Sequence, residues 1–446
     1  MKFKTLFSHL IKRAKSLNLR MVSYRPSPKI GFEMENSTYY DPYAPLRFRD
    51  YRLLLSGRFI SAFANEMLSF AIGWELWLRA HSAFALGMVG LVQVVPVILL
   101  SLPAGHVADQ YNRRRIVIIT EVLIALCVIT LGWLSYTEGS LVLIYISLLG
   151  IGIARAFNEP ASSTLTPETV PPELFSQAAT WGSGIWHVAS ITGPALAGVL
   201  VSFFHSVTFI YVYAALSAVT YCVLISLIKG RQLPLAEKSA TLDSVREGLR
   251  FMWNTKVILA AITLDMFAVL FGGAVALLPI YATDILHVGA QGLGIMRAAP
   301  SLGALAMAFL IAHLPPMKNA GKTLLFAVTG FGLATMVFGL STNFFLSVTM
   351  LMLLGGFDNI SVVIRSTLML TQVPDEMRGR TSAVNNIFIG ISNELGAFES
   401  GFVAALVGPV ITVVGGGIGT ILVVLAIASI FPAMLKLKSL DVPKHS

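Results

Sequence analysis

Hydrophobic residues occur along most of the chain in long continuous runs that are separated by short polar intervals. A helix that spans a bilayer needs about 20 apolar residues, and the strands of a membrane barrel would show alternating rather than continuous hydrophobicity. The pattern therefore predicts an all-α integral membrane protein with twelve transmembrane helices. Their predicted starts lie near Leu53, Leu86, Ile116, Leu141, Ser176, Val207, Val257, Gln291, Lys322, Phe344, Ser382 and Val410.

Two longer polar intervals, at the N-terminus and in the middle of the chain, leave the spans in two sets of six. The predicted organisation is an N-terminal cytoplasmic extension (1–52), a first six-helix bundle (53–229), a cytoplasmic linker (230–255), a second six-helix bundle (256–436) and a cytoplasmic tail (437–446). Apolar residues between Phe3 and Leu17 recur at helical spacing among basic ones, which suits either an amphipathic helix on an anionic membrane surface or a solvated extension. Apolar residues between Leu242 and Met252 predict a short surface helix in the linker.

A sequence repeat relates the two halves. The tripeptide Ser-Thr-Leu at 163–165 recurs at 366–368, an offset of 203 residues. The same offset relates the Val-Pro-Pro-Glu-Leu segment to Val-Pro-Asp-Glu-Met, Gly193 to Gly396 and Gly198 to Gly401. Each copy lies where the fourth span of its half ends and the fifth begins. The repeat predicts two bundles related by a pseudo-twofold axis along the membrane normal, an arrangement that secondary transporters use.

Basic residues are distributed unequally between the two sides of the predicted bundles. Of the 32 Lys and Arg residues, nearly all lie in the extension, the linker, the tail and the loops on the same side. The exceptions are Arg58, Arg79, Arg155, Arg297 and Arg365. Because cytoplasmic loops are rich in Lys and Arg, both termini are predicted to be cytoplasmic. The same bias accounts for the net charge of +9, so no nucleic-acid partner is expected.

Composition narrows the possible functions. The chain is 55% hydrophobic and only 12% charged, against about 25% charged residues in a typical soluble domain. Cys127 and Cys222 lie inside apolar runs and form neither a metal-ligand pattern nor a disulfide framework. A phosphate-binding GxxxxGK loop followed by Ser or Thr is absent, and His and carboxylate residues do not cluster at metal-ligand spacing. We therefore expect no cofactor, no metal site and no enzymatic activity.

The turn after the second span, residues 105–115, reads GHVADQYNRRR. Glycine lets a neighbouring helix approach closely, and Asp109 can accept from helix N-terminal amides or pair with an arginine. The turn resembles the signature loop of the major facilitator superfamily, and the resemblance covers roughly residues 46 to 436. It implies that Gly105, Asp109 and Arg113 form a latch that holds the cytoplasmic side closed in the outward-facing state. Alternatively the arginines only fix topology, which we expect for the two that follow Arg113.

Several segments resemble one group within that superfamily, the bacterial transmembrane secretion effectors and enterobactin exporters. These segments are residues 264–273, 297–300, 357–365, 378–380 and 392–396. In addition, the segment from Gly193 and Pro194 to Gly198 is similar to the antiporter motif of drug exporters, in which a Gly-Pro step bends the helix because proline removes a helical hydrogen bond. The alternative is a kink that serves helix packing only.

Ionisable side chains within the spans supply the candidate site residues. A charge in mid-membrane costs roughly 3 kcal/mol on insertion scales and is usually paired or functional. The resemblance places the substrate cavity between the first, fourth, seventh and tenth spans. The candidate cavity residues are Arg155, Glu159, Asp265, Arg365 and Trp186. A carboxyl group held away from water has a raised pKa and can take up a proton near neutral pH. The candidate proton carriers are Glu66, Asp358 and Glu394.

Two further expectations concern the partners of these charges. The repeat places Arg155 and Asp358 at equivalent positions near mid-span, so they either approach each other across the pseudo-twofold axis or pair within their own helices. Arg58, Glu75 and Glu121 lie near predicted span ends and are expected to reach the membrane interface.

These observations and the resemblance together predict a proton-coupled secondary transporter. It would export a siderophore or another small amphiphilic molecule across a bacterial inner membrane by alternating access, as a monomer with protons, lipid and its small-molecule substrate as partners. One alternative is a carrier of the same fold that moves a drug, a sugar or a lysolipid, in either direction. The other is a non-transporting membrane sensor or scaffold, which the short polar segments disfavour.

Overall fold

The computed structural model describes residues 41–229, 242–315, 317, 319–435 and 437, and the described part is helical without strands. The helix predicted between Phe3 and Leu17 lies outside these residues. The long helices are α2 (Arg49–Ala80), α3 (Ala83–Gln110), α4 (Arg113–Tyr136), α5 (Leu141–Ser163), α6 (Phe175–Phe204), α7 (Thr208–Ser226), α9 (Lys256–Phe271), α11 (Gly289–His313), α12 (Ala320–Leu340), α13 (Phe344–Gln372), α14 (Asp375–Val407) and α15 (Pro409–Ile430).

Short elements connect or flank these helices. They are η1 (Ala44–Arg47), η2 (Thr166–Glu168), η3 (Pro172–Leu174), α8 (Leu242–Asn254), η4 (Gly273–Leu277), α10 (Leu278–Ile280), η5 (Tyr281–Ile285) and α16 (Pro432–Leu435). The surface helix predicted in the linker is α8, and an ion pair between Glu247 and Arg380 connects it to α14.

Ten segments of the described chain are long and apolar enough to cross a membrane. The two further long helices are α2 and α14, with 32 and 33 residues, and at 1.5 Å per residue both exceed the thickness of a bilayer. Polar residues such as Arg58, Glu66 and Glu394 make these two helices less hydrophobic than the others. The predicted all-α fold with twelve spans in two halves is confirmed.

Capping residues account for several helix starts that the apolar pattern located only approximately. Asn112 precedes α4, and its Oδ1 accepts from the amides of Arg114 and Arg115 at 3.0 and 3.3 Å, which satisfies two of the free donors at a helix N-terminus. The largest error concerns α14, which begins at Asp375 and not near Ser382. Its polar first turns extend beyond the apolar run, so hydrophobicity alone could not locate its start.

The sequence suggested one continuous α-helix for the seventh span, but the structure shows a broken one. Helix α9 ends at Phe271, and the chain continues through the 3-10 turn η4, the short α10 and the π-helical turn η5. Gly272 and Gly273 lie at the break, where an added Cβ on Gly272 would come within 2.6 Å of the Phe331 ring. The lack of a side chain lets the chain pass close to α12 at Gly272 and close to α14 at Gly273, and so change direction there.

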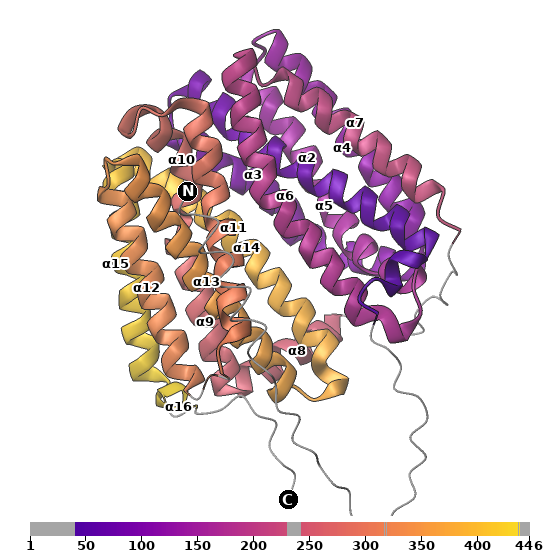
Figure 1. Ribbon diagram of the computed structural model, residues 1–446, viewed down its shortest axis with the longest axis vertical. Helices are drawn as coiled ribbons and strands as arrows, with labels where there is room; N and C mark the ends of the chain where they lie inside the picture. The colour runs from indigo at the N-terminus through magenta and orange to yellow at the C-terminus, as the bar shows by residue number, and fades with distance from the viewer. Residues whose placement is uncertain (1–40, 230–241, 316, 318, 436, 438–446) are drawn as a thin grey trace, which may run out of the picture. The chain divides into compact units, whose positions relative to one another are not determined.

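The two halves repeat one packing order. In the first half (α2–α7) each helix packs against the next in the spatial order α3, α5, α4, α7, α2 and α6. In the second half (α9–α15) the corresponding order is α11, α13, α12, α15, α9 and α14. Figure 1 shows each half as a separate group of helices, indigo to magenta and salmon to yellow. The halves meet through α3 against α14 and α6 against α11. Exchanging the halves converts one of these contacts into the other, as a pseudo-twofold relation requires.

Contact between the halves is concentrated at one end of the helices. The basic end is defined here by the turns at 111–112, 164–174 and 373–374, and the opposite end by those at 81–82, 205–207 and 408. At the basic end each half has its own buried apolar cluster, whereas one cluster near the opposite end includes residues of both halves. Hydrophobic burial therefore joins the halves mainly towards the opposite end.

Glycines allow the close approach at the two crossings between the halves. An added Cβ on Gly198 of α6 would lie 2.6 Å from the carbonyl oxygen of Ala290 and 3.1 Å from the Cα of Gly294, both in α11. The repeat-related Gly401 of α14 contacts Gly87 of α3 in the same way. Backbone packs directly against backbone at both crossings, which no larger residue would permit.

Replacement of Gly198 by alanine should destabilise the protein, because a methyl group would have to displace the backbone of α11. We expect a loss of about 1–3 kcal/mol, the usual cost of overpacking. Gly184, in the same helix, has no atom within 4 Å of an added Cβ, so Gly184→Ala should stabilise by up to about 1 kcal/mol through helix propensity. Thermal unfolding in detergent measures both effects, and the prediction is wrong if the two variants shift Tm in the same direction.

Candidate functional site

A cavity of about 690 Å³, which we call the inter-half cavity, is lined by residues of both halves. From the first half come parts of α2, α3 and α6, including Trp186 and His187. From the second half come the break after α9 and parts of α11, α12, α13 and α14. Charged side chains in its wall are Arg297, Asp358 and Glu394. Two of the three candidate proton carriers thus face this cavity, together with the candidate aromatic residue Trp186.

Arg297 links the halves at the wall of this cavity. From α11 it donates to the carbonyl oxygen of Ser69 at 2.7 Å and to its hydroxyl at 2.8 Å, both in α2. Trp77 makes a second link, since its indole nitrogen donates to the Thr283 hydroxyl at 2.7 Å. The sequence identified Arg297 as an arginine within a span and as part of the family resemblance, but not as a candidate site residue. Its contact with Ser69 could not be predicted, because it depends on how α11 packs against α2.

Glu66, the third candidate proton carrier, lies in α2, the helix that accepts the hydrogen bonds of Arg297. It is half-buried and lies near Arg297 and Arg155, whose charges act on its carboxylate. Gly193 of α6 packs directly on it, because an added Cβ would lie 2.8 Å from the Cβ of Glu66. Glu66 therefore lies near positive charges that come from both halves.

A second cavity of about 780 Å³ lies within the first half, between α2, α4, α5, α6 and α7, and is called the first-half cavity. It contains the candidates Arg155, Glu159 and Trp186. Arg155 donates to Gln93 Oε1 at 2.8 Å and to Asn65 Oδ1. The two amides had no distinguishing signal in the sequence, because their role depends on which helices lie next to α5.

Two carboxylates expected at the membrane interface are instead buried. Glu121 is 4% exposed and accepts from the Asn158 amide at 3.0 Å in the wall of the first-half cavity. Glu75 is 7% exposed, accepts from the Tyr211 hydroxyl at 2.6 Å and pairs with Arg79 at 3.1 Å. The expectation was wrong for both, because polar partners on neighbouring helices stabilise them inside the bundle.

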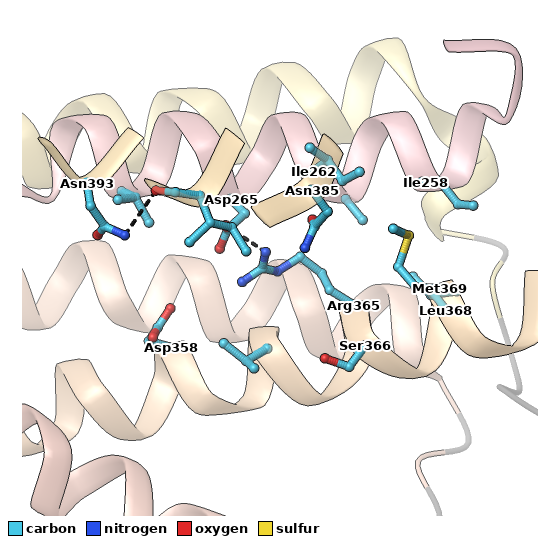
Figure 2. A pocket seen from close by; sticks show the side chains of 14 residues that line it. Ile258, Ile262, Asp265, Asp358, Arg365, Ser366, Leu368, Met369, Asn385 and Asn393 are labelled. Atoms are coloured by element: carbon cyan, nitrogen blue, oxygen red, sulfur yellow. Dashed lines mark hydrogen bonds and ion pairs between the residues drawn. The ribbon is translucent and has the colours of Figure 1, made fainter. Parts of the chain in front are cut away.

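A smaller pocket of about 160 Å³ lies in the second half and is called the second-half pocket (Figure 2). Asp265 of α9 and Arg365 of α13 form an ion pair at 2.7 Å across it, and both side chains are almost fully buried. Asp358 also lines this pocket and the inter-half cavity, so it lies between the two spaces. The candidates Asp265 and Arg365 are thus paired with each other and do not line the inter-half cavity.

Arg155 and Asp358 do not approach each other as one of the two hypotheses proposed. Within the described residues Arg155 bonds to amides of α3 and α2, whereas Arg365, which lies in the same helix as Asp358, forms its ion pair with Asp265 of α9. Pairing of Asp358 within its own helix therefore stays a prediction. Arg155 instead bonds to neighbouring helices of the first half.

The residues of the predicted latch lie at the basic end. Gly105 and Asp109 belong to the last turns of α3, and Arg113 begins α4. Arg113 and Arg114 both pair with Glu168 of η2, at 3.5 and 3.2 Å. Arg114 thus has the same partner as Arg113, and its assignment to topology alone stays a prediction. Glu168 was missed, since a carboxylate in a loop gives no signal in a hydrophobicity pattern.

The antiporter-like segment lies inside α6. Gly193 packs on α2, Gly198 packs on α11, and Pro194 is buried between them. This arrangement agrees with a packing role for the two glycines, and a role in setting the direction of transport stays a prediction.

Removal of one partner of the buried pair should be far more harmful than removal of both. Asp265→Ala leaves Arg365 buried without its carboxylate, which should cost about 3–5 kcal/mol, whereas Asp265→Ala with Arg365→Met should recover much of that loss. The exposed Glu247–Arg380 pair is the matched control, where Glu247→Ala should cost less than about 1 kcal/mol. Denaturant unfolding in detergent tests this, and equal losses at the two pairs would contradict it.

Comparison with known sequences extends these observations. The family model described as transmembrane secretion effector matches residues 40–444. The enterobactin exporter EntS of Citrobacter koseri is 26% identical over 380 residues, which cover 84% of this chain and 89% of that protein. EntS of Escherichia coli O1:K1 is 24% identical over the same shares of the two chains.

Solved structures with low sequence identity share the fold. A bacterial homologue of the human lysosomal transporter Spinster, in an inward-facing and occupied conformation, has a TM-score of 0.68 at 13% identity, over 90% of this chain and 98% of that one. A bacterial homologue of the iron transporter ferroportin, in an inward-facing state, has a TM-score of 0.66 at 15% identity, over 86% and 98%. Taken with the family match over nearly the whole chain, these results show that the protein belongs to the transmembrane secretion effector family of the major facilitator superfamily and is a multi-pass membrane transporter.

Proposed function

We propose that this protein is a proton-coupled exporter that moves a siderophore-like amphiphile across a bacterial inner membrane. The observation that carries the proposal is the inter-half cavity, because both halves contribute to its wall and it combines apolar surface with Arg297, Asp358 and Glu394. Its volume is in the range of small-molecule sites. A site between two halves can be exposed to either side of the membrane in turn when the halves rock against each other. The relatives named as enterobactin exporters support the choice of cargo.

The distribution of contacts supports an inward-facing state. With both termini in the cytoplasm, as the basic loops predict, the opposite end faces away from the cytoplasm. The shared apolar cluster and the two glycine crossings close the molecule towards that end. Export would then require the halves to separate there and to approach each other at the basic end, where Asp109 and Arg113 are the proposed latch.

Proton coupling is assigned to carboxylates in and beside the inter-half cavity. Glu394 lies in its wall, and the charges of Arg155 and Glu159 in the other half act on it. Protonation would neutralise the carboxylate of Glu394. It would thereby remove both its attraction to Arg155 and its repulsion from Glu159, and so change the electrostatic interaction between the halves. Asp358 and Glu66 are the other candidates, since each lies near an arginine.

Everted membrane vesicles provide a direct test of direction and coupling. Metal-free enterobactin would be added outside energised vesicles while lumenal pH is monitored. We expect enterobactin to enter the lumen and protons to leave it, so that lumenal pH rises relative to vesicles without the protein. Uptake without any change in lumenal pH would contradict proton coupling, and absence of uptake would contradict the proposed cargo.

Glu394→Gln should separate substrate binding from proton coupling, because a glutamine keeps the size of the side chain but cannot take up a proton. We expect proton-driven uptake to fall by about tenfold or more, in the range usual for loss of a proton-transferring group, while exchange of enterobactin in the absence of a gradient persists. Glu399→Gln is the control, since Glu399 lies in the same helix but lines none of the three cavities. Unchanged gradient-driven uptake in Glu394→Gln would remove this residue from the candidates.

A further inference from the structure

The first-half cavity and the second-half pocket occupy equivalent places in the two halves. The offset of 203 residues that relates the halves maps lining residues of one onto lining residues of the other. The equivalent pairs are Arg155 and Asp358, Glu159 and Val362, Ser162 and Arg365, Ser163 and Ser366, Gly182 and Asn385, and Trp186 and Ile389. On α2 and α9 an offset of 204, as between Pro96 and Pro300, pairs Ser61 with Asp265 and Asn65 with Val269.

Despite this equivalence, the cavity volumes are about 780 Å³ in the first half and about 160 Å³ in the second. In the second half the side chains of Arg365 and Asp265 meet across the space (Figure 2). The first half has Ser162 and Ser61 at those positions, which are too short to meet. A buried ion pair therefore fills this space in the second half, whereas the short serine side chains leave the equivalent space open in the first half.

The wall of the first-half cavity contains one charged group without a protein partner. Arg58, Arg155 and Glu121 each bond to neighbouring side chains or backbone. Glu159, by contrast, is exposed in the cavity wall and makes no hydrogen bond or ion pair within the described chain. A carboxylate there can accept hydrogen bonds from hydroxyl groups of a ligand.

Trp186 connects this cavity to the inter-half cavity. Its indole lines both spaces, and 53% of its surface is exposed although it lies within α6. Phe175, at the start of the same helix, lines the first-half cavity as well. Aromatic side chains beside an apolar wall favour the binding of aromatic rings by stacking and edge contacts.

We propose that the first-half cavity is a second compartment of the substrate site, which takes a hydroxylated aromatic part of the cargo, such as a catechol ring. Stacking would involve Trp186, and Glu159 would accept hydrogen bonds from the hydroxyl groups. The inference rests on the proposed export function and adds to it that the cargo binds asymmetrically, in the first half more than in the second. A lipid chain in the same space would need neither Glu159 nor a hydroxyl group.

Filling the cavity tests the inference. Gly182 lines the first-half cavity and has no atom within 4 Å of an added Cβ, so Gly182→Trp places a large side chain in open space. Gly184 is equally open, lies in the same helix and lines neither large cavity, which makes Gly184→Trp the matched control. We expect uptake of enterobactin into everted vesicles to fall about tenfold or more, the equivalent of 1.4 kcal/mol, in Gly182→Trp only.

A second variant introduces into the first half the two residues that form the ion pair in the second half. Ser61→Asp combined with Ser162→Arg would install in the first half the ion pair of the second, and should reduce enterobactin uptake to a similar extent. Normal uptake in both Gly182→Trp and this double variant would overturn the inference, as would equal losses in Gly182→Trp and Gly184→Trp.

Cysteine protection gives a readout that does not depend on transport. In a chain with Cys127→Ala and Cys222→Ala, enterobactin should slow the maleimide labelling of Gly182→Cys about tenfold and leave Gly184→Cys unchanged. Labelling of Gly182→Cys that is unaffected by enterobactin, or slowed equally by a phospholipid, would overturn the inference. Protection without uptake by the parent chain would uphold the compartment and contradict only the proposed export.

Discussion

Charged side chains inside a bilayer need partners within the protein, and this constraint organises both halves of the molecule. Water cannot compensate a buried charge there, so each such charge raises the cost of insertion unless a neighbouring helix offers a partner. Asp265 has Arg365, Glu75 has Tyr211 and Arg79, and Glu121 has Asn158. Apart from the Glu75–Arg79 pair within α2, these contacts join different helices and favour their side-by-side packing inside each half.

The internal repeat shows how one scaffold accommodates two different interiors. The same helix order and the same glycine crossings recur in both halves. The differences lie in the side chains that point inward, where Ser162 replaces Arg365 and Gly182 replaces Asn385. Close-packed small residues set the backbone, and the inward-facing side chains then decide how much space remains.

The sequence predicted those features that depend on local pattern. Continuous apolar runs indicated the approximate position of each long helix, because the part of a helix that lies in lipid must be apolar. The repeat and the signature loop gave the two-bundle arrangement. By contrast, the break after Phe271 depends on how Gly272 and Gly273 meet α12 and α14. The starts of polar-ended helices such as α14 could not be located, since hydrophobicity marks only the part that lies in lipid.

Partners of the candidate residues could not be predicted for a related reason. Arg155 was identified as an intramembrane charge, but its bonds to Gln93 and Asn65 depend on the packing of α5 against α3 and α2. Glu75 and Glu121 were assigned to the interface from their distance to the span ends, although tyrosine and asparagine on other helices stabilise them inside. Position along a helix gives depth in the membrane, whereas burial depends on which neighbouring helix faces the residue.

The separate apolar clusters at the basic end suit a molecule whose halves move as units. Each half keeps its own core there, so the shared cluster near the opposite end could separate without unfolding either half. Such a change needs new contacts at the basic end to replace those that are lost. Gly105 has no atom within 4 Å of an added Cβ in the present state, so its small size has no packing role here. A glycine at this position becomes useful only if another helix approaches α3, which is the geometry that closure at the basic end would produce.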